Sequence, residues 1–117
     1  MFMTGTAALV MLASGTPAQV GYEPLIEGRD TAAVEQIQAN TELAADDPVK
    51  LINLGIAYAR QGRTEEARDM FETAMRGADR LVLETAKGEW KDSRHLARLA
   101  LAMLDRGEFR TERMAAR

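Results

Sequence analysis

Cysteine is absent from this chain of 117 residues. Its absence excludes a disulfide scaffold, a thiolate nucleophile, and any zinc or iron–sulfur site that uses cysteine ligands. Histidine occurs once, as His95, which excludes a histidine-rich metal site and leaves one candidate base for a catalytic triad. The 15 Lys and Arg nearly balance the 18 Asp and Glu, and aromatic residues make up 5% of the chain. We therefore expect no nucleic-acid partner, because neither cationic excess nor stacking surface is present.

Catalytic motifs are also missing. Ser14 and Ser93 are the only serines, neither lies in a Gly-x-Ser-x-Gly elbow, and the glycines form no phosphate-binding loop. The adjacent carboxylates Asp46 and Asp47 stand at an expected helix start, where capping is a commoner role than acid–base or metal chemistry. His95 lies one position off an apolar stripe, so we expect a partly exposed helix residue rather than a general base. The sequence predicts a protein that is not an enzyme and uses no metal or cofactor.

The amino-terminal segment differs from the rest of the chain. Met1–Gly21 carries no charged side chain, and residues 7–13 are a short apolar run followed by small residues at Thr16 and Ala18. The run is far shorter than the ~20 residues that a membrane span needs. We interpret residues 1–18 as a signal peptide, which places the protein in a bacterial periplasm or outside the cell. No Lys or Arg precedes the apolar run, so the alternative is a disordered or helical extension on a cytoplasmic protein.

Residues 19–117 are expected to form one helical domain. Apolar residues recur there at spacings of three and four, and Asp47 before Pro48, Gly62, and Asp92 before Ser93 are helix-end signals. Together they predict helices at about 30–44, 48–60, 64–78 and 93–106, with a short last helix from about 109. A small β-hairpin is expected around 81–91, where Leu81-Val82-Leu83 is separated from Trp90 by Lys87-Gly88.

A pattern of small and large apolar residues recurs along this domain. Small residues at Gly55 and Ala67 would let two helix axes approach closely, and large side chains would fill the space around the crossing. The pattern comprises Leu51, Leu54, Gly55, Tyr58, Gly62, Ala67, Phe71 and Ala74. Part of it recurs 34 residues earlier, at Gly28, Ala33 and Ile37, and part 45 residues later, at Leu96, Leu99, Ala100 and Met103.

This pattern and its 34-residue period resemble the tetratricopeptide repeat (TPR) family, with one full repeat and two partial ones. The resemblance implies an all-α fold, a short α-solenoid of antiparallel helix pairs. It also implies a non-catalytic adaptor or scaffold that binds a peptide or partner helix of another protein in its concave groove. The alternative is a structural protein that completes its stack by forming a homodimer, because about three repeats are needed for stability.

Three polar residues are candidates for peptide binding. Asn53 and Arg98 occupy equivalent positions 45 residues apart, and Arg94 lies one helical turn before Arg98. They resemble three of the five members of the carboxylate clamp with which some TPR proteins hold acidic chain ends. The two members expected from the first helix of the first repeat are missing. The alternative is a solvated face on which Arg94 and Arg98 pair with Asp92 or Glu89.

Three apolar residues lie off the repeat pattern. Ile52 and Ile56 are one turn apart and away from the Leu51/Leu54 stripe, so we expect an exposed pair and add both to the peptide-binding set. Trp90 is predicted to cap the edge of the repeat, with an exposed anchor for a partner as the alternative.

Overall fold

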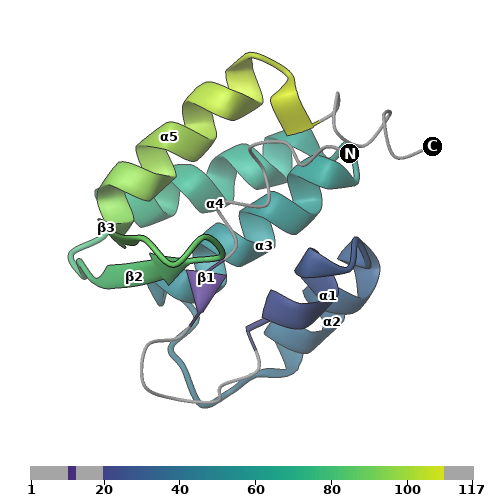
Figure 1. The fold of residues 1–117 in the computed structure, drawn as a ribbon, viewed down its shortest axis with the longest axis horizontal. Helices are drawn as coiled ribbons and strands as arrows, with labels where there is room; N and C mark the ends of the chain where they lie inside the picture. Colours follow the sequence, from purple (N-terminus) through teal and green to yellow (C-terminus); the bar gives the residue numbers. More distant parts are fainter. Residues whose placement is uncertain (1–10, 13–19, 110–117) are drawn as a thin grey trace.

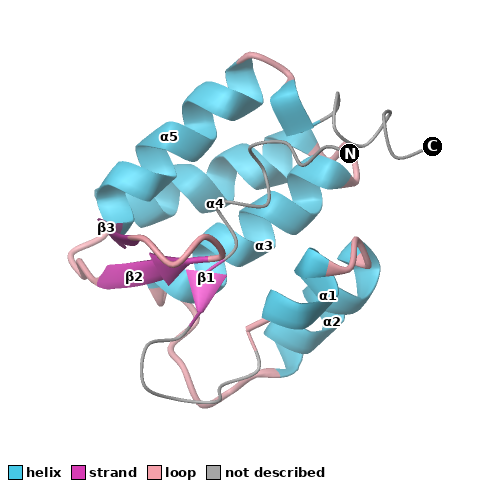
Figure 2. Cartoon of the chain, viewed as in Figure 1, coloured by secondary structure: helices cyan, strands magenta, loops and turns pink. Residues whose placement is uncertain are grey.

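The computed structural model describes residues 11–12 and 20–109 (Figures 1 and 2). Its helices are α1 (Tyr22–Ile26), α2 (Asp30–Ala39), α3 (Pro48–Arg60), α4 (Thr64–Arg76) and α5 (Ser93–Asp105). Its strands are β1 (Met11–Leu12), β2 (Val82–Thr85) and β3 (Trp90–Asp92). The mostly helical fold of packed helix pairs is confirmed, and so is the small hairpin near residues 81–91.

The helix ends follow the predicted capping signals. The Asp47 carboxylate accepts a hydrogen bond from the Val49 amide at 2.9 Å, which starts α3. The helix predicted to reach about residue 44 instead ends at Ala39, because Asn40 turns the chain out of helical geometry. The Asn40 side-chain oxygen accepts from the Glu42 and Leu43 amides, at 2.8 and 3.2 Å, and stabilises this turn.

The helices pack as successive antiparallel pairs. α3 lies against both α2 and α4, and α5 packs on the other side of α4 (Figure 1). Phe71 on α4 stacks on Phe109 near the end of the described chain, with ring centroids 6.1 Å apart. α1 has only five residues and contains Pro24.

The strands form a small antiparallel sheet in the order β1-β2-β3. β2 pairs with β3 so that Leu83 lies opposite Lys91, and Met11 of β1 lies opposite Thr85. The strand β1 was not predicted, and it lies within the segment interpreted as a signal peptide. The rest of that segment, and the residues beyond 109 for which a short last helix was predicted, lie outside the described residues.

The core is continuous from the first repeat to the hairpin and is centred on α3. Nearly every residue of α3 is buried, so the helix is enclosed nearly all round. The largest fully buried side chains are Phe71, Phe109, Leu25, Ile37, Ile52, Ile56, Leu83, Leu96 and Asn53. The surfaces left for binding are therefore on the hairpin, α5 and the outer faces of α2 and α4.

Candidate protein-interaction surface

Ile52 and Ile56 are fully buried, so the expectation of an exposed apolar pair is wrong. The reason is that α3 is packed on several sides, against α2, α4 and α5 and also against β1. A signal for this was present in the sequence. Between Pro48 and Arg60 the only charged residues are Lys50 and Arg60, and a helix that is apolar nearly all round is normally a buried one.

Asn53 is also fully buried and contacts the chain's own amino-terminal part. Its side-chain amide donates a hydrogen bond to the Val20 carbonyl at 2.8 Å. Two turns further along α3, Arg60 donates from Nη1 to the Leu25 carbonyl at 2.7 Å. α3 thus uses two polar side chains to hold main-chain carbonyls at either end of the segment 20–25.

Arg94 and Arg98 have different environments. Arg94 is partly buried, and its Nη2 donates to the Gly77 carbonyl at 2.6 Å, which ties α5 to the end of α4. Arg98 is exposed. With Asn53 buried, Arg94 turned to Gly77 and Arg98 in solvent, the structure does not gather the three candidates on one exposed surface.

Asp92 organises the junction between the hairpin and α5. Its Oδ1 accepts from the main-chain amides of Arg94 and His95, at 2.7 and 3.3 Å, as the predicted N-cap. Its Oδ2 pairs with Arg80, whose Nη2 lies 2.6 Å away. The pKa of the Asp92 carboxyl lies below its usual value. The hydrogen bond from Arg80 lowers it most, and those from the two amides lower it further. Asp92 therefore pairs with Arg80 rather than with the two arginines of α5.

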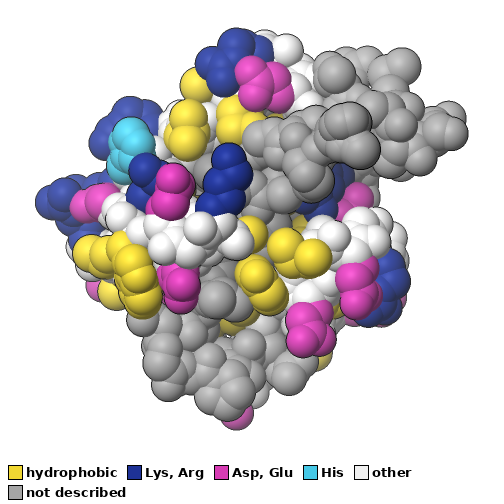
Figure 3. Space-filling model, viewed as in Figure 1, with side chains coloured by type: hydrophobic (Ala, Val, Ile, Leu, Met, Phe, Trp, Pro, Cys, Tyr) yellow, Lys and Arg dark blue, Asp and Glu magenta, His cyan; other side chains and the backbone are white. Residues whose placement is uncertain are grey.

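The hairpin exposes a small group of apolar side chains, which we call the hairpin patch: Leu81, Val82 and Trp90. Val82 is 59% exposed and Trp90 is 56% exposed. Trp90 lies opposite Glu84, two positions from Val82 on the neighbouring strand, so the two side chains share one face of the sheet. Hydrophobic side chains are visible over β2 (Figure 3). Trp90 does not cap the repeat, and its exposure agrees with the alternative of an anchor.

A second exposed strip runs along α5, and we call it the α5 face: His95, Arg98 and Leu99. Arg98 and Leu99 lie three and four residues after His95, so each is a neighbour of His95 on the helix surface. Leu99 is 38% exposed. Lys and Arg side chains surround the amino-terminal part of α5 (Figure 3). The strip offers an apolar side chain beside a cation.

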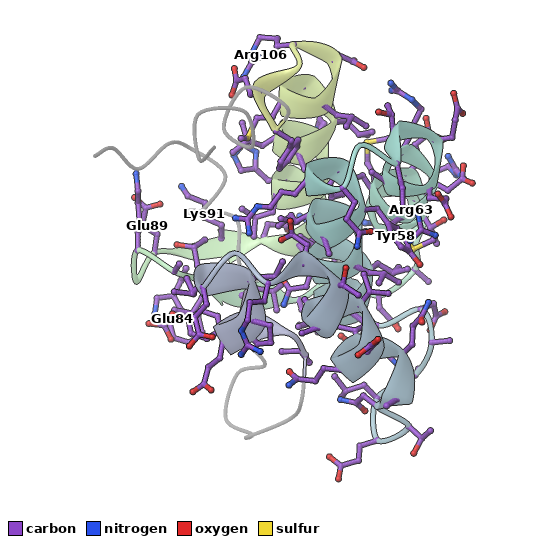
Figure 4. The ribbon with its side chains drawn as sticks, turned by 90° about the vertical axis from the view of Figure 1, so that its right-hand side faces the viewer. Tyr58, Arg63, Glu84, Glu89, Lys91 and Arg106 are labelled. Carbon is purple, nitrogen blue, oxygen red and sulfur yellow. The ribbon has the colours of Figure 1, made fainter. Side chains whose placement is uncertain are left out.

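The turn between α3 and α4 is held by a surface cluster. The Arg63 guanidinium lies 4.4 Å from the centroid of the Tyr58 ring and pairs with Glu66 (Figure 4). The hydrogen bond between Arg63 and Glu66 raises the pKa of Arg63 and lowers that of Glu66. Arg106 and Glu108 form a similar pair at the end of α5, where the hydrogen bond raises the Arg106 pKa. Both pairs are local, between residues three and two positions apart in the sequence.

The described part of the chain contains no cluster of three or more His, Cys, Asp or Glu side chains able to hold a metal ion. Within the same residues, no helix is both long enough and apolar enough to cross a membrane.

The tetratricopeptide repeat family model matches residues 50–82, which run from α3 through α4 to the first residue of β2. These residues are a tetratricopeptide repeat. Within this TPR, α3 and α4 are the paired helices, and Gly62 in their turn has a φ of 82°. Gly28, 34 residues earlier, has a φ of 79° in the turn between α1 and α2, as the predicted period requires.

Two curated proteins are similar to part of the chain. Cellulose synthase operon protein C of Komagataeibacter xylinus is 39% identical over 62 residues, and its namesake from Komagataeibacter sucrofermentans is 37% identical over 62 residues. Each match covers 53% of this chain but 5% of the relative. No solved structure matches the chain significantly.

Proposed function

We propose that this chain is a non-catalytic adaptor or scaffold that binds a peptide or helix of another protein through the α5 face. The TPR in residues 50–82 supports a protein-interaction role in general. The observation that carries the finer proposal is the difference between two equivalent helices. On α3 the candidate Asn53 is buried by the chain itself and Leu54 is half-buried, whereas the equivalent positions on α5, Arg98 and Leu99, are both exposed.

The chemistry of the α5 face defines the expected ligand. Leu99 favours an apolar side chain, and Arg98 favours a carboxylate within reach of its guanidinium. Among the described residues Arg98 makes no ion pair, so its charge is available to a ligand. We assign Asn53 and Arg94 structural roles, because each is engaged with a main-chain carbonyl. The expected partner is a segment with an apolar residue next to an acidic one.

The test compares two charge reversals on different helices. Arg98→Glu changes the α5 face, and Arg76→Glu makes the same charge change at an exposed position on α4. A partner is first captured with the wild-type chain in its native host, purified, and titrated calorimetrically against both variants. We expect Arg98→Glu to weaken binding by about tenfold or more, since a charged hydrogen bond is lost, and Arg76→Glu to bind like the wild type. Equal affinities for the two variants would contradict the proposal.

The similarity to a protein named for a cellulose synthase operon supports a cellulose synthase complex as the first place to look for the partner. We also propose a location outside the cytoplasm, as the charge-free amino-terminal segment predicts. Intact-mass measurement of the protein from its host tests this point. Cleavage near Gln19 would support it and would remove β1, whereas a full-length chain would contradict it.

A further inference from the structure

We infer that the outer edge of β3 pairs with the same edge of a second copy of this chain, so that the two small sheets join into one antiparallel sheet. This inference is independent of the proposed binding through the α5 face, which uses other residues. It also differs from the stacking of helical repeats as a route to a dimer. Three observations carry it: the orientation of the β3 main chain, the charges beside Trp90, and the exposure of Trp90.

The main chain of β3 alternates between the side of β2 and the outer edge. The Thr85 amide donates to the Glu89 carbonyl at 2.8 Å, and the Ser93 amide donates to the Leu81 carbonyl at 2.7 Å. Residues 89 and 93 thus direct their main-chain groups toward β2. In an antiparallel ladder the main-chain groups of successive residues point alternately to the two sides of a strand. Trp90 follows Glu89 directly, so its N–H and C=O point away from β2. β3 is the last strand of the sheet that the structure describes, so these two groups form an open edge.

The charges on the two sides of Trp90 are complementary to the same charges in a second copy of the chain. A two-fold axis at Trp90 would place Glu89 opposite Lys91 of the second copy, and Lys91 opposite Glu89 of the second copy. Shifting the axis to Lys91 would set two lysines against each other, and shifting it to Glu89 would set two glutamates against each other. Opposite charges in facing positions stabilise antiparallel pairs and like charges destabilise them. The sequence Glu89-Trp90-Lys91 therefore selects one register of self-pairing.

The side chains needed for this pairing are accessible in the single chain. Glu89 and Lys91 lie 3.9 Å apart as a loose ion pair, with 54% and 36% of their side chains exposed. Figure 4 shows both on the hairpin side of the molecule. In the inferred dimer the two Trp90 side chains become cross-strand neighbours on one face, and aromatic pairs of this kind are favourable. The edge has three residues, so we expect a weak dimer that depends on concentration.

The experiment uses the full chain and the fluorescence of Trp90, which is the only tryptophan. Sedimentation velocity over a concentration series gives the dimer affinity, and the emission maximum reports burial of the indole. The variants are Glu89→Lys, Lys91→Glu and the double exchange Glu89→Lys/Lys91→Glu. Circular dichroism melts confirm that each variant folds, and Arg98→Glu serves as a control on the other surface.

We expect the wild type to dimerise with a blue shift of the emission, and each single variant to dimerise about tenfold more weakly. The double exchange restores the dimer, because its facing charges are again opposite. An equal mixture of the two single variants forms a heterodimer more readily than either forms a homodimer, since four facing charges then become complementary. Arg98→Glu dimerises like the wild type. A chain that stays monomeric at every concentration, or a dimer that does not respond to these charges, would overturn the inference.

Discussion

Gly55 on α3 lies directly against the ring of Phe71 on α4. A Cβ atom placed on Gly55 would come within 2.4 Å of Cε1 of Phe71, closer than real Cβ contacts allow. Phe71 is fully buried and also stacks on Phe109, so its ring has little room to move aside. This one contact sets how closely the two helices of the TPR approach.

Gly55→Ala should destabilise the protein even though alanine is the better helix former. Overpacking costs about 1–3 kcal/mol, whereas replacing glycine by alanine in a helix gains at most about 1 kcal/mol. Chemical denaturation measures the free energy of unfolding. Adding Phe71→Leu makes room for the new methyl group, so the double variant should lose less than the sum of the two single losses. If the two losses simply add in the double variant, the contact between Gly55 and Phe71 is not the cause of the destabilisation.

Gly62→Ala should also destabilise the protein, for a different reason. The φ of 82° at Gly62 lies in the left-handed region, and no atom lies within 4 Å of a Cβ placed there. The cost is therefore backbone strain, about 1–2 kcal/mol. Gly62→Asn should cost less, because asparagine tolerates this conformation better than alanine does. The two melting temperatures, compared at one pH, decide the point; an equal loss for both would contradict it.

Arg60→Met should loosen the first repeat. Methionine keeps much of the apolar stem of Arg60 but removes the donor to the Leu25 carbonyl at 2.7 Å and the ion pair to Asp30 at 3.4 Å. Loss of a buried hydrogen bond predicts a decrease of about 1–3 kcal/mol in unfolding free energy. Hydrogen exchange should become faster first in α1. Arg76→Met, at an exposed pair with Glu72, is the control and should change little. Equal effects of the two variants would show that Arg60 does not anchor α1.

Asp92→Asn should make the stability of the protein depend less on pH. The Asp92 pKa is lowered in the folded state, chiefly by the hydrogen bond from Arg80. Its ionic contribution to stability is therefore present above the ordinary aspartate value of about 3.9 and is lost as the pH falls through the lowered pKa. Asparagine is also a good N-cap, so the substitution removes mainly the charge. The variant should melt below the wild type at pH 7, and the gap should narrow below about pH 4. A gap that is the same at every pH would contradict the ionic role.

The repeat itself was predictable from the sequence because its signals are local. Asp47, Gly62 and Asp92 are helix-end residues whose effect does not depend on distant parts of the chain. Gly55 and Ala67 were predicted at the helix crossing from their size and spacing, and the crossing is observed. The hairpin followed from Leu81-Val82-Leu83 and the turn before Trp90.

The surface was harder to predict because burial depends on what packs on each helix. Ile52 and Ile56 lie off the main apolar stripe, but contacts from the first repeat and from β1 cover the other side of α3. The hydrogen bond from Arg94 to the Gly77 carbonyl also joins α5 to the end of α4, and no local sequence pattern specifies this contact. The pairing of Met11 and Leu12 with β2 is likewise a long-range contact, made by residues that the sequence placed in a signal peptide.

The most direct test of an adaptor that binds through α5 is site-specific photo-crosslinking in the native host. A photoreactive residue is placed at Leu99 in one variant and at Asp69, an exposed position on α4, in the other. The account predicts a crosslinked adduct with another protein from position 99, weakened by Arg98→Glu, and none from position 69. The same adducts from both positions, or none from position 99 while position 69 reacts, would contradict it.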